Sequence, residues 1–227
     1  MRNAPALSLL ILAAVDAEPS RVAILVSGEA LHGDSGRKGG NDDTARGRGW
    51  ACAAAESFRT NLVEPLERTG RDVDVFVATA AKDGCDAWFE SWRAALGPRL
   101  RAYAVARASR SRSVAFRRSV DLAIRWNVNR RPVHYECDLT DDVPPATSAF
   151  RAQILAQTYA TVIVARPDAV WRDPRYAASL VATDDVVYTH RCEAHVWRRW
   201  QCVSDVVIAM PARVFVESLK PCAWAWF

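Results

Sequence analysis

The chain has 227 residues, 50% of them hydrophobic, and a formal net charge of +4. A chain of this length suits one domain with a substantial core. Its apolar content excludes a protein that is disordered throughout.

The N-terminus has the pattern of a secretory signal peptide. Arg2 gives a positive start, residues 4–15 form an apolar stretch, and Val15-Asp16-Ala17 offers a small-residue cleavage site. The stretch is shorter than the roughly 20 residues that a helix needs to cross a bilayer. We therefore expect residues 1–17 to be a signal peptide, or an uncleaved N-terminal anchor, followed by one domain over residues 18–227.

The beginning of the domain predicts a β-α-β unit. An apolar strand at residues 21–27 is followed by a polar, glycine-rich loop at residues 29–49. Apolar residues then recur at helical spacing over 52–67, and residues 73–78 predict the next strand. Units of this kind build parallel sheets. The loop is either a solvated insertion or a segment that becomes ordered on a ligand.

The remaining chain continues to alternate helices with strands. Helical spacing of apolar residues predicts helices through Trp88–Leu96, Phe116–Ile124 and Phe150–Leu155, and one that begins at Pro211. Short apolar runs predict strands at residues 100–105, 161–165, 185–189 and 206–210. The pattern indicates an α/β fold with a mostly parallel central sheet flanked by helices.

Two of the predicted strands stop at residues that suit ligand binding. The first strand ends in Ser27 and Gly28, and the strand at 161–165 is followed by Arg166, Pro167 and Asp168. Ligands of open α/β sheets bind at the carboxyl ends of the strands. We therefore expect Ser27, Gly28, Arg166 and Asp168 at a site, although an ion pair for Arg166 and a turn cap for Asp168 are structural alternatives.

Four blocks of sequence carry a resemblance to a known family. They are VAILVSG at residues 22–28, SFRTNLVEPL at 57–66, DVFVAT at 74–79 and VIVARPD at 162–168. Their order and spacing resemble a poorly characterised glycosyltransferase-like family, in which an Asp-containing strand and helix follow, as at Ser204–Pro211 here. The resemblance covers nearly the whole chain after residue 20.

The resemblance implies a Rossmann-like GT-A domain that transfers a sugar from a nucleotide-sugar donor to a glycan, protein or small acceptor. It implies that Ser27 and Gly28 let the backbone approach the nucleotide, and that Arg166 contacts the diphosphate. Asp168 and Asp205 are the implied catalytic residues. Asp168 binds the donor sugar or a divalent metal, Mn²⁺ or Mg²⁺, to which hard oxygen ligands are suited, and Asp205 serves the acceptor side. For Asp205 a turn at the entry to a strand is the structural alternative.

A tryptophan-rich segment offers a second kind of binding surface. Trp197, with Trp200, Trp224 and Trp226, presents rigid aromatic faces that suit sugar rings, although such residues are more often core or partner contacts. The Arg-Pro-Asp block also supplies one carboxylate where an Asp-x-Asp pair is usual. The alternative function is therefore a catalytically inactive luminal or secreted carbohydrate-binding or interaction domain on a degenerate transferase scaffold.

The cysteines and the N-terminus together predict the location. An even number of cysteines behind a signal peptide favours disulfides, with buried free thiols as the alternative. We expect the protein in the lumen of the endoplasmic reticulum or Golgi, or secreted. The six residues are Cys52, Cys85, Cys137, Cys192, Cys202 and Cys222.

Two other functions have weaker support from the sequence. His190, Cys192, His195 and Cys202 are zinc-type donors, but their spacing matches no familiar zinc module. Arginines are dense between Arg99 and Arg131, but the apolar residues there have helical spacing, which favours a solvated helix face over a grip on nucleic-acid phosphates. We expect no nucleic-acid partner, and no transmembrane span beyond the N-terminal segment.

Overall fold

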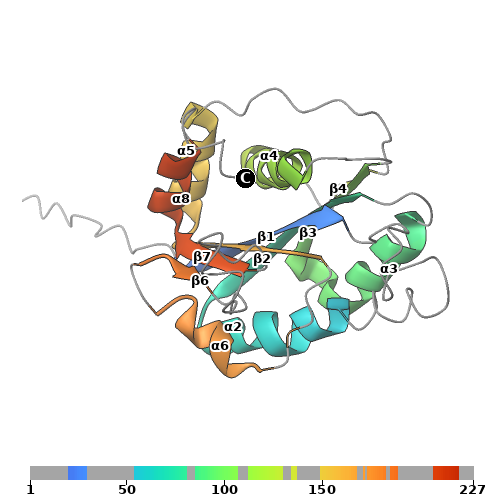
Figure 1. The fold of residues 1–227 in the computed structure, drawn as a ribbon, viewed down its shortest axis with the longest axis horizontal. Helices are drawn as coiled ribbons and strands as arrows, with labels where there is room; N and C mark the ends of the chain where they lie inside the picture. Colours follow the sequence, from blue (N-terminus) through green and yellow to red (C-terminus); the bar gives the residue numbers. More distant parts are fainter. Residues whose placement is uncertain are drawn as a thin grey trace, which may run out of the picture.

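A computed structural model describes much of the predicted domain, and a single sheet forms its centre. The described residues are 20–29, 54–80, 85–106, 112–129, 134–136, 149–167, 171, 173–182, 185–188 and 207–219. Their strands pair in the order β4-β3-β2-β1-β5-β7-β6 (Figure 1). The strands are β1 (Arg21–Glu29), β2 (Asp72–Ala80), β3 (Leu100–Ala106), β4 (His134–Glu136), β5 (Thr161–Ala165), β6 (Val187–Tyr188) and β7 (Val207–Pro211).

Most of this sheet is parallel. β4, β3, β2, β1 and β5 pair in parallel with their neighbours. β7 runs the other way and pairs antiparallel with both β5 and β6. The predicted α/β class and the mostly parallel central sheet are therefore confirmed.

Helices cover both faces of the sheet. In Figure 1, α4, α5 and α8 lie on one face, and α2, α3 and α6 lie on the other. No helix in the described part of the chain is both long and apolar enough to cross a membrane. The helical elements are a turn at 54–58, the π-helical turn η1 (Arg59–Val63), α2 (Glu64–Arg68), α3 (Cys85–Leu96), the 3₁₀ turn η2 (Gly97–Arg99), α4 (Arg112–Asn129), α5 (Ala149–Thr158), α6 (Arg175–Ser179) and α8 (Ala212–Ser218).

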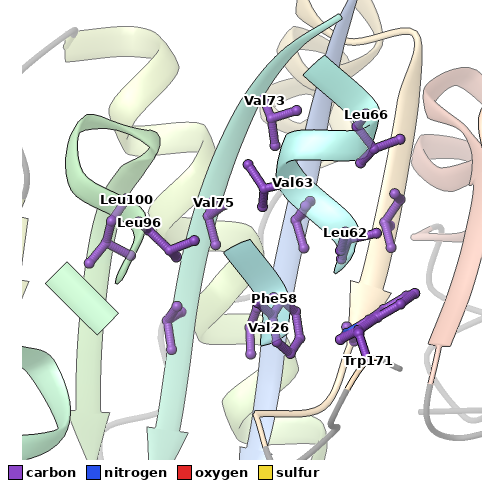
Figure 2. Close-up of a cluster of buried hydrophobic side chains, with 14 of the residues drawn as sticks. Val26, Phe58, Leu62, Val63, Leu66, Val73, Val75, Leu96, Leu100 and Trp171 are labelled. Carbon is purple, nitrogen blue, oxygen red and sulfur yellow. The ribbon is translucent and has the colours of Figure 1, made fainter. Parts of the chain in front are cut away.

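The alternation of side chains along each strand divides the core into two layers. In β2, Val73, Val75 and Val77 pack with the α2 and α3 face, whereas Phe76 and Ala78 pack with the α4 face. Figure 2 shows the first layer, with Val73 and Val75 near Leu62, Val63 and Leu66 of the helical segment. Because both faces are buried, the strands read as nearly continuous apolar runs in the sequence.

The structure differs from the predicted elements in short or interrupted segments. β4 and α6 were not predicted because three and five residues are too few to show a period. The predicted helix over 52–67 contains the π-helical turn η1 near its middle. Pro65 has no N–H to donate to the carbonyl of Asn61, so the regular helical bonding is interrupted there. The N–H of Glu64 bonds to the carbonyl of Arg59, five residues earlier, which is the π-helical pattern.

The order of the strands creates a switch point beside β1. From β1 the chain adds β2, β3 and β4 on one side, and then returns to place β5 on the other side. Connections that leave two neighbouring parallel strands in opposite directions open a crevice at their carboxyl ends, and ligands bind there in open α/β sheets. The carboxyl ends of β1 and β5 are therefore the first place to look for a site.

A buried carboxylate ties the amino ends of three strands together. Asp74 of β2 has a side chain that is 1% exposed. It accepts hydrogen bonds from Arg21 of β1 at 2.5 Å, from Arg101 of β3 at 2.6 Å, and from the hydroxyl of Tyr159 at 2.9 Å. Buried charges require partners of this kind because an unpaired one carries a large desolvation cost.

The cluster around Asp74 extends into the helices above the sheet. Both Arg21 and Arg101 lie over the ring of Trp126 in α4, with the guanidinium carbon 5.5 Å and 4.9 Å from the ring centroid. Asn127 donates to the Tyr159 hydroxyl at 3.0 Å. Burial, followed by the charge of Asp74, raises the pKa of Tyr159 well above its ordinary range, so its proton stays in place to bond Asp74.

Replacing Asp74 with Asn tests whether this cluster holds the fold. Asp74→Asn leaves Arg21 and Arg101 without their anion, and we expect it to lower the free energy of unfolding by about 3 kcal/mol, measured by urea denaturation. Glu90→Gln is the control, because it breaks an ion pair with Arg93 whose side chains are both more than half exposed, and it should change little. Equal stability of both variants would mean that the Asp74 pair is no stronger than a surface pair.

Candidate functional site

The carboxyl ends of β1 and β5 bring two of the predicted site segments together. The ladder between the two strands ends where Val26 pairs with Ala165, while β1 continues beside β2 as far as Glu29. A Cβ added to Gly28 would lie 3.4 Å from Cδ of Pro167. The segments Ser27–Gly28 and Arg166–Pro167, about 140 residues apart in sequence, are therefore neighbours at one edge of the sheet.

Gly28 has a backbone conformation that other residues rarely adopt. Its φ is 135°, in a region that is open to glycine and strained for residues with a Cβ. Ser27, Gly28 and Arg166 are all half-buried. Beyond Val26, no described strand continues the ladder on the β5 side of β1. Backbone at this position lies next to the switch point, where a ligand of an open α/β sheet would approach it.

Thr79 is a polar residue of this edge that was not among the site residues expected from the sequence. It pairs with Gly28 in the register of β1 and β2 and is 3% exposed. Its hydroxyl has no hydrogen-bond partner among the residues that the structure describes, although nearly all buried polar groups in proteins have one. It continues the row of Val73, Val75 and Val77, so it faces the α2 and α3 side. The signal in the sequence was the threonine that ends the apolar run DVFVAT.

The helical segment that follows β1 holds the chain just after β5. Ser57 accepts a hydrogen bond from the backbone N–H of Trp171 at 3.0 Å, and the amide of Asn61 donates to the Trp171 carbonyl at 2.7 Å. The ring of Phe58 packs edge-on to the Trp171 ring at 5.8 Å between centroids. Figure 2 shows Phe58, Val26 and Trp171 together toward the arrowhead end of the strands. The block SFRTNLVEPL is thus linked to the segment that begins with Arg166.

Other predicted site residues lie outside the described part of the chain. These are Asp168, Asp205 and Trp197, together with the glycine-rich loop after Glu29 and the N-terminal segment 1–17. Five of the six cysteines lie outside it too; Cys85, at the start of α3, is within it. Their roles, and the disulfides, stay predictions.

The described residues at this edge do not by themselves fit a divalent metal. The described side chains of Ser27 and Thr79 supply hydroxyl oxygens, whereas Mg²⁺ and Mn²⁺ prefer carboxylates. Among the residues that the structure describes, no group of three or more His, Cys, Asp and Glu side chains could hold a metal ion. A metal at this edge would need carboxylates from outside the described side chains, and Asp168 is the one predicted for that role.

The edge has the chemistry of an anion site. Arg166 supplies a guanidinium, which matches phosphate oxygens in a bidentate geometry. Thr79 supplies a hydroxyl, and Gly28 lets a ligand come close to the backbone.

Comparison with protein-family models, with curated proteins and with solved structures gave no match. The case for a function therefore rests on the sequence pattern and this geometry.

Replacing Thr79 with Val tests whether its hydroxyl serves the fold. Because the hydroxyl is buried without a partner among the described residues, we expect Thr79→Val to raise the free energy of unfolding by about 1 kcal/mol, measured by urea denaturation. Thr158→Val is the matched control, since the Thr158 hydroxyl donates to the Ile154 carbonyl at 2.8 Å, and its loss should cost about 1 kcal/mol. A destabilised Thr79→Val would assign the hydroxyl a structural role.

Proposed function

We propose that the protein is a glycosyltransferase of GT-A type, which transfers a sugar from a nucleotide-sugar donor to a glycan, protein or small acceptor. The observation that carries the proposal is the approach of Gly28 to Pro167 at the switch point between β1 and β5. Two blocks of the family resemblance, which are remote in sequence, meet there at the edge where open α/β sheets bind nucleotides.

In this proposal each residue of the edge has a distinct role. Ser27 and Gly28 lie against the nucleotide, and Arg166 binds the diphosphate. The Thr79 hydroxyl, which has no partner in the described part of the chain, gains one in the ligand. Asp168 follows Pro167 directly in the sequence and binds the donor sugar or a divalent cation, which would neutralise the leaving diphosphate.

The register of β7 supports a role for Asp205 at the same edge. β7 is antiparallel to β5, so its first residue, Val207, pairs with Ala165 at the end of β5. Asp205 precedes Val207 by two residues in the sequence, a separation of at most about 7 Å. We propose that Asp205 acts on the acceptor. The secretory location, proposed from residues 1–17, would give the enzyme luminal or secreted glycans as acceptors.

Nucleotide binding is the decisive test. Residues 18–227 would be screened for thermal shifts with UDP, GDP and CMP, and with their sugars, with and without Mn²⁺. Ligand at 100 times its Kd stabilises by about 2.7 kcal/mol, which raises Tm by roughly 5 to 10 °C for a domain of this size. We expect one nucleotide to give such a shift.

Variants assign that shift to the proposed site. Arg166→Gln should weaken binding about tenfold or more by removing charge-assisted hydrogen bonds, and Arg166→Lys should restore it only in part. Asp168→Asn should remove any dependence on Mn²⁺. Arg93→Gln, which changes an arginine on the exposed side of α3, is the control and should bind as the parent does.

Two results would contradict the proposal. The first is a well-folded protein that none of the nucleotides stabilises. The second is binding of glycans without any nucleotide, which would instead favour the carbohydrate-binding domain. Thr79→Val adds a further check, since a variant that folds at least as well as the parent should bind the nucleotide more weakly.

A further inference from the structure

We infer that Ser57, Phe58 and Asn61 form a clamp on Trp171 that positions Arg166 for the ligand. The part of this inference that concerns the ligand rests on the proposed function, whereas the clamp itself rests on the contacts alone. We use the word clamp for these three residues. All three belong to the block SFRTNLVEPL, whose pattern they help to define.

The clamp engages both polar groups of the Trp171 backbone. The Ser57 hydroxyl donates to the Ala54 carbonyl at 2.8 Å, which leaves its oxygen oriented to accept the Trp171 N–H at 3.0 Å. The Asn61 amide donates to the Trp171 carbonyl at 2.7 Å. A residue outside any strand thus has its donor and its acceptor satisfied by side chains of one helical segment, as buried backbone requires.

The third member of the clamp fixes the side chain. Phe58 is fully buried, and Trp171 is 8% exposed. Their rings meet edge to face, with an interplanar angle of 73°, and Phe58 also packs on Trp92 at 5.1 Å. Aromatic pairs in this arrangement contribute beyond the area that they bury. Trp171 is therefore held at its N–H, its carbonyl and its ring.

The π-helical turn explains why one short segment reaches all three groups. Asn61 lies inside η1, where the helix departs from its ordinary hydrogen bonding. Ser57 precedes this turn, and Pro65 follows it. Turns of this kind interrupt α-helices frequently at functional sites. Here the turn carries the one clamp residue that donates to the Trp171 carbonyl.

The clamp affects the proposed site because it holds one end of the short connection between Pro167 and Trp171. Pro167 approaches Gly28 at one end, and Trp171 is clamped at the other. Arg166 adjoins Pro167 in the sequence, so the freedom of its side chain depends on how firmly both ends of this connection are held. The clamp residues are positioning residues, because they act on the site through Trp171.

Two variants remove the clamp bonds with little change of shape. Asn61→Asp replaces the donating NH₂ by an oxygen that faces the Trp171 carbonyl, and Ser57→Ala removes the acceptor of the Trp171 N–H. Ser119→Ala is the matched control for the second variant. Ser119 is also buried and donates to the carbonyl three residues earlier at 2.8 Å, but within its own helix, α4.

The first measurement is hydrogen exchange of the peptide that contains Trp171, on residues 18–227 without ligand. We expect Asn61→Asp and Ser57→Ala to speed its exchange about tenfold, and Ser119→Ala to leave it unchanged. This measurement needs no nucleotide, so it tests the clamp even if the proposed function fails. Unchanged exchange in both clamp variants would overturn the inference.

The second measurement is the affinity for whichever nucleotide stabilises the parent protein. We expect Kd to rise about tenfold in both clamp variants and to stay constant in Ser119→Ala, under conditions where all are folded by circular dichroism. Faster exchange with unchanged Kd would reduce the clamp to a structural contact and overturn its positioning role. If the parent binds no nucleotide, the proposed function fails, and the exchange result alone decides whether the clamp exists.

Discussion

The burial of Asp74 is the constraint on which the sheet depends. A carboxylate that is almost fully excluded from water is tolerated only with partners, and its partners come from β1, from β3 and from Tyr159, which lies between α5 and β5. These contacts fix the amino ends of the strands relative to one another. Since β1 and β2 then pair from Arg21 to Glu29 with no shift of register, the same constraint aligns Gly28 with Thr79 at the opposite end.

The resemblance blocks have different physical roles in the structure. Asp74, which begins the block DVFVAT, lies at the amino end of β2, far along the strand from the candidate site, and stabilises the sheet. Thr79, which ends the same block, lies at the site edge, and its hydroxyl bonds to none of the residues that the structure describes. Ser57 and Asn61 connect the helical segment to Trp171. A motif read from sequence alone therefore mixes residues that maintain the fold with residues that form or position a site.

The sequence predicted the layers of the fold better than the site. Strand 161–165 has the predicted bounds because a threonine and four apolar residues are followed by Arg166 and Pro167, and a proline has no N–H to donate to a strand ladder. Strand order and register decide three features of the site. These are the approach of Pro167 to Gly28, the burial of the Thr79 hydroxyl and the clamp on Trp171. Those arise from long-range packing and leave no periodic signal. Among these residues only Gly28 was expected at a site, because it follows an apolar run.

The charge balance at the candidate edge constrains the proposed chemistry further. A nucleoside diphosphate that leaves a sugar carries more than one negative charge, and Arg166 supplies a single positive charge there. In a site from which water is excluded, the remaining charge must be met by a cation or by further donors, because an uncompensated ion is costly to bury. A divalent metal on Asp168, as proposed, would meet that need with hard oxygen ligands, whereas hydroxyl donors such as Thr79 supply only partial charge. If transfer proves independent of metal, the balance requires a second cationic side chain or further hydrogen-bond donors at the edge.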